Sequence, residues 1–213
     1  MKAGVLGTGV VGLAISNRLV ELGHEVMIGT RDPSKSGDKL KSKNGAVKVG
    51  TFAEASTFGQ VVFNATNGAA TLEVLQLAGE SNLNGKVLVD ISNPLDFSKG
   101  MPPTLLVSNT DSLGEQIQRT FPQVKVVKTL NTVTANIMVY PKQTADGDHH
   151  IFISGNDARA KEQVVEILKG FGWDHVLDLG DITTARGTEM YLPIWVRLWS
   201  ALGTGMFNIK VMT

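Results

Sequence analysis

A glycine-rich hexapeptide near the start of the chain restricts the possible folds more than any other feature. It follows the pattern G-x-G-x-x-G and reads Gly7, Thr8, Gly9, Val10, Val11, Gly12. A short apolar run (3–6) precedes it and a run with helical periodicity (11–22) follows. In a dinucleotide-binding βα turn the glycines allow the tight turn, the close approach of a pyrophosphate and the packing of helix on strand. We therefore expect residues 7–11 to bind phosphate groups through the helix N-terminus.

Short β-branched runs alternate with helical patterns along the chain, which favours βαβ units and a parallel sheet. The predicted strands are 3–6, 25–28, 46–49, 61–65, 87–90, 124–129, 150–153 and 175–179, and the predicted helices are 11–22, 33–41, 70–80, 111–120 and 157–171. The tail 184–213 reads as one long amphipathic helix with a short apolar end, packed on the core or on a subunit partner. The predicted fold is α/β, a doubly wound, mainly parallel Rossmann sheet with a short C-terminal helical extension. We expect one domain, with a nucleotide-binding core in 1–130 and residues 131–213 completing the cleft.

Charge and composition exclude several classes of protein. Twenty basic and twenty acidic side chains cancel, so no net field favours nucleic acid or an anionic membrane. The chain has no cysteine, which excludes disulfides and thiolate chemistry and fits a cytoplasmic protein. The apolar N-terminal run is far shorter than the roughly 20 residues of a membrane-spanning helix. No metal-ligand spacing occurs, and we expect no metal site.

The end of the second predicted strand favours NADP over NAD. An NAD site has an acidic residue there, whereas this strand ends in Gly29-Thr30. Arg31 follows, and its planar guanidinium suits a 2′-phosphate, with Lys35 one helical turn further on. Asp32 has the spacing of a ribose-binding acid, but we interpret it as the N-cap of a helix that begins at Pro33.

Three loops that follow predicted strands share small hydroxyl and amide residues. Parallel strands bring these loops together at the carboxyl edge of the sheet. We expect the side chains there to hydrogen-bond a carboxamide and to flank a planar ring. They are Ala65, Thr66 and Asn67, then Ser92 and Asn93, then Asn131, Thr132 and Thr134. For Ser92 and Thr134 an ordinary turn or capping role is an equally good interpretation.

None of these loops carries His, Lys, Tyr, Glu or Asp. Oxidation of an alcohol needs a general base, whereas hydride exchange between two redox rings needs mainly positioning. We therefore expect no catalytic acid or base and direct hydride transfer to a small-molecule redox co-substrate. A non-catalytic NADP(H)-binding redox sensor or interaction protein is an open alternative, as is a carbonyl or imine reductase with a substrate-supplied proton.

Several segments resemble the coenzyme F420-dependent NADP oxidoreductases and the cytosolic domain of the STEAP metalloreductases. They are GVLGTGVVGLAISNRLVELGHEVMIGTRDPSK, DISNP, VVKTLNTV, SGNDARAKEQVVEILKGFGW and LPIWVRLWSALGTGMFNIKV. The resemblance implies NADP phosphates on residues 7–11, the 2′-phosphate on Thr30, Arg31 and Lys35, and nicotinamide near Ala65, Asn93 and Asn131. It also implies F420 or a related flavin as co-substrate and a homodimer built with the C-terminal segment. The residues themselves do not distinguish a deazaflavin from FMN, FAD, a quinone or a chelated metal.

Overall fold

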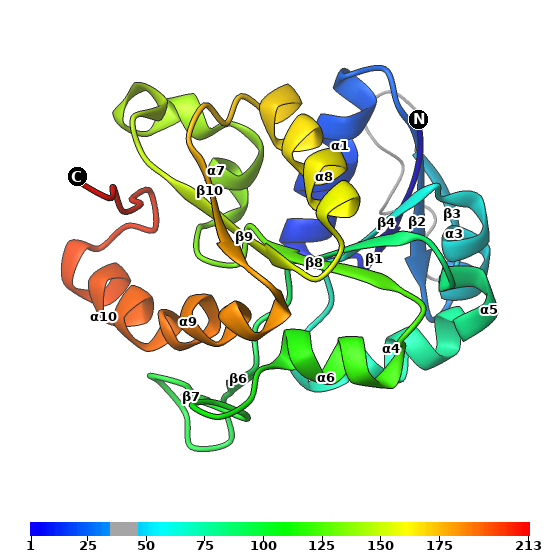
Figure 1. Ribbon diagram of the computed structural model, residues 1–213, viewed down its shortest axis with the longest axis horizontal. Helices are drawn as coiled ribbons and strands as arrows, with labels where there is room; N and C mark the ends of the chain where they lie inside the picture. Colours follow the sequence, from blue (N-terminus) through cyan, green and yellow to red (C-terminus); the bar gives the residue numbers. More distant parts are fainter. Residues whose placement is uncertain (35–46) are drawn as a thin grey trace.

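A central sheet organises the protein, as the computed structural model shows for residues 1–34 and 47–213 (Figure 1). Within these residues the sheet has eight strands in the order β10-β9-β8-β5-β4-β1-β2-β3. The strands are β1 (Lys2–Leu6), β2 (Glu25–Thr30), β3 (Val47–Thr51), β4 (Val61–Asn64), β5 (Val87–Asp90), β8 (Lys125–Thr129), β9 (Ile151–Gly155) and β10 (Val176–Gly180). Every described pair in this sheet is parallel except β8 with β9, which is antiparallel. The predicted Rossmann-like α/β fold is confirmed.

Helices cover both faces of the sheet, which explains why its inner strands are apolar on both sides. One layer contains α1 (Val10–Glu21), α7 (Ala135–Val139) and α8 (Ala158–Phe171), and the other contains α3 (Phe52–Phe58), α4 (Thr71–Ala78), α5 (Glu80–Leu83) and α6 (Leu113–Thr120). In Figure 1, α1 and α8 lie above the sheet, and α4 and α6 lie below it. Along β5, Val87 and Val89 belong to the first core, whereas Leu88 belongs to the second. The twofold alternation of a strand thus divides its side chains between two cores.

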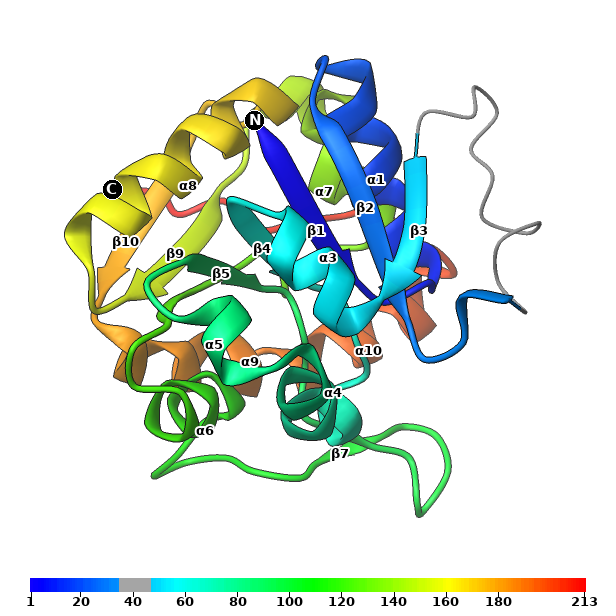
Figure 2. The same ribbon diagram turned by 90° about the vertical axis from the view of Figure 1, so that its right-hand side faces the viewer.

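The C-terminal segment adds two helices beyond β10, at the carboxyl side of the sheet. They are α9 (Ala185–Met190) and α10 (Leu192–Leu202). Short 3-10 turns complete the connections: η1 (Gly68–Ala70), η2 (Pro141–Gln143), η3 (Ala145–Gly147) and η4 (Ile182–Thr184). A small hairpin of β6 (Leu95–Asp96) and β7 (Thr104–Leu105) lies below the helical layer in Figure 1, and Figure 2 shows its loop projecting at the bottom of the view. No helix in the described part of the chain is long and apolar enough to cross a membrane.

Two predicted helices are wrong in their extent. The run 70–80 is divided into α4 and α5 because Gly79, at φ 86°, leaves the helical conformation. The tail is divided at Tyr191 because Pro193 has no N–H with which to continue the hydrogen-bond ladder, and α10 ends at Gly203. The prediction did not include α3, α7 or the β6–β7 hairpin. The predicted helix 33–41 begins at Pro33 as expected, and its remainder from 35 onward lies outside the described residues.

Candidate functional site

The turn between β1 and α1 has the geometry that its glycines predicted. Gly7 adopts φ 117°, and a Cβ on it would lie 2.5 Å from the backbone oxygen of Ala65. A Cβ on Gly12 would lie 2.1 Å from the backbone oxygen of Gly7. Gly9 is the N-cap of α1 and has no side chain to cap the first-turn amides, while the space beside it is open for 4 Å. The helix N-terminus therefore presents unpaired amides to an open space, as an anion site requires.

The end of β2 lies beside this turn. Thr30 is buried, and Arg31 follows it on the surface. Asp32 Oδ1 accepts from the backbone N (3.1 Å) and the hydroxyl (2.5 Å) of Ser34, at the point where the chain begins to turn helically. This contact supports the capping interpretation of Asp32. Lys35, the second predicted phosphate ligand, lies outside the described residues.

These elements enclose the first of two neighbouring cavities, here called the phosphate-loop cavity. Its volume is about 460 Å³, and it is lined by Gly7, Thr8, Gly9, Gly29, Thr30, Arg31, Asp32, Phe52, Ala65, Thr66, Asn67, Ala70 and Val74. Most of the predicted phosphate and ribose residues therefore lie together at one edge of the sheet.

The second cavity, here called the amide cavity, continues from the first. Its volume is about 370 Å³, and Ala65, Thr66 and Asn67 line both. The remaining lining residues are Val10, Val11, Gly68, Ile91, Ser92, Asn93, Leu95, Phe97, Asn131, Val133, Thr134, Ala135, Met138, Leu192 and Trp195. The loops after β1, β4, β5 and β8 thus converge as predicted. Among the described residues, no His, Lys, Tyr, Glu or Asp lines this second cavity.

An amide pair holds two sides of the amide cavity together. Asn93 Nδ2 donates to the backbone oxygen of Asn131 (2.8 Å), and Asn131 Nδ2 donates to Asn93 Oδ1 (2.9 Å) and to the backbone oxygen of Thr188 (3.2 Å). Because backbone oxygens only accept, these contacts fix the orientation of both side-chain amides. In this orientation, no described residue donates a hydrogen bond to Asn131 Oδ1. Since Asn131 lines the cavity, this oxygen is available as an acceptor.

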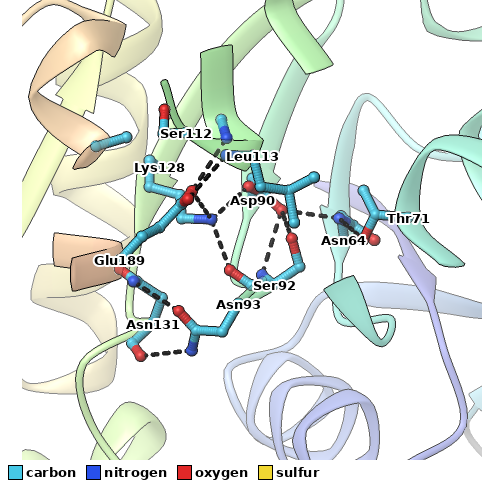
Figure 3. Close-up of polar contacts among 12 residues, drawn as sticks. Asn64, Thr71, Asp90, Ser92, Asn93, Ser112, Leu113, Lys128, Asn131 and Glu189 are labelled. Carbon is cyan, nitrogen blue, oxygen red and sulfur yellow. Dashed lines mark hydrogen bonds and ion pairs between the residues drawn. The ribbon is translucent and has the colours of Figure 1, made fainter. Parts of the chain in front are cut away.

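A fully buried charge cluster lies directly behind this pair (Figure 3). Lys128 Nζ contacts Asp90 Oδ2 at 2.8 Å, Glu189 Oε1 at 2.9 Å and the backbone oxygen of Ser92 at 2.6 Å. Glu189 also accepts from the backbone N–H groups of Leu113 (2.8 Å) and Gly114 (3.0 Å), at the N-terminus of α6. Burial lowers the pKa of Lys128, but the two carboxylates outweigh it and hold the pKa above its ordinary value. The lysine is therefore charged.

The cluster continues to the loop after β4. Asp90 Oδ1 accepts from Asn64 Nδ2 (2.7 Å) and from the Ser92 hydroxyl (2.7 Å), and Asn64 Oδ1 accepts from the Thr66 hydroxyl (2.6 Å). These contacts connect the loop after β4 with the loop after β5. Leu130, between Lys128 and the amide pair, is at φ 63°, a conformation that is uncommon for leucine and that often marks functional sites.

The structure assigns different environments to the predicted site residues. Ser92 uses its hydroxyl inside the cluster, and Asn67 Oδ1 caps η1 by accepting from Ala69 N (2.9 Å). Thr134 is the N-cap of α7 without a side-chain cap bond and lines the amide cavity. Thr132 is buried, lines neither cavity, and its hydroxyl has no partner among the described residues. Thr132 is thus near the site but not at its surface.

Sequence reasoning missed the cluster and the apolar wall of the amide cavity. The signal for the cluster was a lysine and an aspartate inside apolar strands, VVKT and VLVD, where a charge requires a partner. Phe97 comes from a segment to which the sequence assigned no strand or helix, and Trp195 comes from the tail interpreted as a packing helix. The four histidines precede strands and line neither cavity. Residues 1–34 and 47–213 contain no group of three His, Asp or Glu that could hold a metal ion.

Comparisons with known proteins place this geometry in a family. The family model for coenzyme F420-dependent NADP oxidoreductases matches residues 2–94. A crystal structure from Arthrobacter sp. FB24, assigned by name to the F420-dependent NADP reductases, is 55% identical with a TM-score of 0.97 and covers 100% of this chain and 99% of its own. This chain belongs to the F420-dependent NADP oxidoreductase family. The predicted resemblance and enzyme class, an NADP-dependent oxidoreductase, are confirmed.

Two further relatives differ in how much of their own length this chain covers. The F420-dependent NADP reductase of Methanocaldococcus jannaschii is 28% identical over 97% of either chain. The metalloreductase STEAP3 of Rattus norvegicus is 29% identical over 97% of this chain but only 40% of its own length. The chain therefore spans less than half of the STEAP relatives and nearly all of the archaeal reductase.

Proposed function

We propose that this chain binds NADP(H) across the two cavities and transfers a hydride between the nicotinamide and coenzyme F420 or a related flavin-type acceptor. The proposal rests on one observation: residues 65–67 line both cavities, so the two cavities adjoin each other. The phosphate-loop cavity offers the backbone amides of α1 and the guanidinium of Arg31. The amide cavity offers the side-chain amides of Asn93 and Asn131 and an apolar wall. A dinucleotide needs the first for its phosphates and the second for its nicotinamide ring.

The phosphate-loop cavity fits NADP(H) at the points where this chain must recognise it. The open space at Gly9 admits a pyrophosphate against the first-turn amides of α1. Arg31 lines the same cavity and can form a bidentate contact with a 2′-phosphate. Thr30 adds a hydroxyl at the strand end, and Lys35 belongs to the proposal as a second cation. The site favours NADP(H) over NAD(H) because Arg31 can contact the 2′-phosphate, a group that NAD(H) lacks.

The amide cavity fits a carboxamide next to a planar ring. Asn131 Oδ1 accepts no bond within the described protein and can accept from the carboxamide NH₂ of nicotinamide. Asn93 holds Asn131 in place and lines the same cavity with Ala65. The buried hydroxyl of Thr132 adds a polar atom behind this loop.

The rest of the amide cavity supplies a wall for the second ring. Leu95, Phe97, Met138, Leu192 and Trp195 form its apolar lining. When both ring systems are bound, the reduced nicotinamide gives a hydride to the acceptor and becomes oxidised, while the acceptor takes any further proton from solvent. The cavity needs to orient the rings and exclude water, and the lack of titratable side chains among the described residues that line it agrees with that role.

Anaerobic mixing with NADPH and F420 tests the proposal. We expect equimolar loss of NADPH and oxidised F420, and no comparable rate with NADH. FMN, FAD, a quinone and a ferric chelate serve as alternative acceptors. NADPH binding without turnover on any of these acceptors would contradict hydride transfer and favour a non-catalytic redox sensor.

We further propose that the chain acts in the cytoplasm as a homodimer built with its C-terminal segment. Apolar side chains on and after α9 are exposed: Met190, Ile194, Trp199, Leu202 and Met206. Such a group of exposed apolar side chains is typical of a protein interface. Light scattering on the purified protein tests this proposal, because a monomer across the micromolar range would contradict it.

A further inference from the structure

We propose that Lys128, Asp90 and Glu189 are positioning residues: they hold helix α9 in place and thereby orient the side chains that contact the nicotinamide ring. The inference rests on the proposed function, because it assigns these residues to the orientation of the ring rather than to the binding of phosphates. None of the three lines either cavity. They act through Asn93 and Asn131, which do.

The hydrogen-bond geometry leaves the cluster no second arrangement. Each of the three protons of Lys128 has an acceptor: Asp90 Oδ2, Glu189 Oε1 and the backbone oxygen of Ser92. All oxygens of both carboxylates accept and none donates. An amide in place of either carboxylate would direct N–H toward another donor. The cluster therefore requires one ammonium and two carboxylates, and Lys128 has no proton available for the acceptor.

The cluster joins segments that are distant in sequence at the wall of the amide cavity. Through Ser92 it fixes the loop that continues into Asn93. Through Glu189 it fixes α9, in which the backbone oxygen of the neighbouring residue, Thr188, accepts from Asn131 Nδ2. Movement of α9 would therefore break one of the two contacts that orient the Asn131 amide, the bond from Nδ2 to the backbone oxygen of Thr188. In Figure 3, the contacts among Glu189, Lys128 and Asp90 lie above the Asn93–Asn131 pair.

Stability alone does not explain such a cluster. A buried ion group costs desolvation energy that its internal attraction barely recovers, and apolar replacements of the same volume are often equally stable. A fully satisfied polar network does specify one arrangement of the segments that it joins. The three residues lie where one arrangement matters most, since a displacement of about 1 Å can reduce hydride transfer by about a hundredfold.

The variant Glu189→Gln tests the positioning role with two ligands. In the proposed binding mode, adenosine 2′,5′-bisphosphate would contact only the phosphate-loop cavity, whereas NADPH would reach both cavities. We expect the Kd of NADPH to rise by about tenfold and kcat with F420 to fall by at least as much, because misplacement of a bound group costs about this much or more. The Kd of the bisphosphate should remain within about twofold, because the phosphate loop is untouched.

Glu115→Gln is the matched control. Glu115 also joins α6 to α9, through Arg186 at 2.8 Å, but unlike Glu189 it does not contact Lys128. We expect this variant to lower Tm without changing the ratio of the two Kd values. Glu189→Asp, which keeps the charge but shortens the reach, replaces Glu189→Gln if that variant does not fold, with the same selective loss expected.

Parallel weakening of NADPH and bisphosphate binding in the Glu189 variants, or no change in either, would overturn the positioning role. The proposed function fails separately, if the wild-type protein binds no NADPH or reduces no acceptor.

Discussion

The two cavities of this protein are built in different ways, although they share a wall. The phosphate-loop cavity depends on local backbone: a glycine turn at 7–12 and the end of β2, which are neighbours in one βαβ unit. The amide cavity depends on side chains that meet from β5, β8 and α9, far apart in the sequence. The shape of the phosphate-loop cavity is fixed by the backbone conformation of a short segment, and that of the amide cavity by a buried hydrogen-bond network. Substitutions should therefore affect them in distinguishable ways.

The largest effect should come from removing the central charge of the network. Lys128→Met leaves Asp90 and Glu189 buried without their cation, and we expect a loss of about 3–5 kcal/mol in unfolding free energy. Lys125→Met is the control on the same strand, because Lys125 pairs with Asp157 at the surface and should cost less than about 1 kcal/mol. Urea unfolding measures both. Equal losses of unfolding free energy in the two variants would show that the buried network contributes no more than a surface ion pair.

Two substitutions in the glycine turn should separate an effect on stability from an effect on NADPH binding. Gly12→Ala places a Cβ 2.1 Å from the backbone oxygen of Gly7, and we expect a loss of about 3 kcal/mol. Gly9→Ala meets nothing within 4 Å and its φ of −76° suits alanine, so its stability should stay near wild type. The added methyl group occupies the space assigned to the pyrophosphate and should weaken NADPH binding. Unchanged NADPH affinity in Gly9→Ala would remove the phosphate loop from the site.

Arg31→Ala should weaken NADPH selectively. A charge-assisted contact contributes about 1.5–3 kcal/mol, which corresponds to a rise in Kd of about tenfold to a hundredfold. NADH has no 2′-phosphate, and its Kd should change by less than about twofold. Calorimetric titration of both nucleotides into both proteins gives the four values. An equal loss for NADPH and NADH would mean that Arg31 does not read the 2′-phosphate.

A surface ion pair supplies the smallest effect and a reference for the buried one. Arg119 donates to both oxygens of Asp111 at 2.9 Å and holds its pKa well below the ordinary value. Asp111→Asn should cost about 1 kcal/mol at neutral pH. Because the folded pKa is depressed, this contribution is present above the unfolded pKa of about 3.9 and is lost as the pH falls toward the folded pKa. Urea unfolding at about pH 7 and about pH 3 should therefore show the difference shrinking; a constant difference would contradict the assignment.

The same contrast explains what could be predicted from the sequence. The β1 turn and the capping role of Asp32 follow from local rules, and the structure agrees with them. Asn93 and Asn131 could be placed at the cleft because they follow parallel strands. That Glu189 would pair with Lys128 could not be predicted, since no local pattern relates the two. Pro193 carried a local signal for the helix break at Tyr191, which the apolar periodicity of the tail obscured.

Transfer of deuterium from 4-deuterated NADPH to F420 tests the central claim most directly. If the two rings meet in the amide cavity, the reduced F420 formed by this protein should carry the deuterium, and the rate should show a primary isotope effect when transfer limits turnover. Reduced F420 without deuterium, with the label lost to water, would contradict direct hydride transfer. NADPH that binds with no F420 reduced would instead leave a nucleotide-binding protein without this reaction.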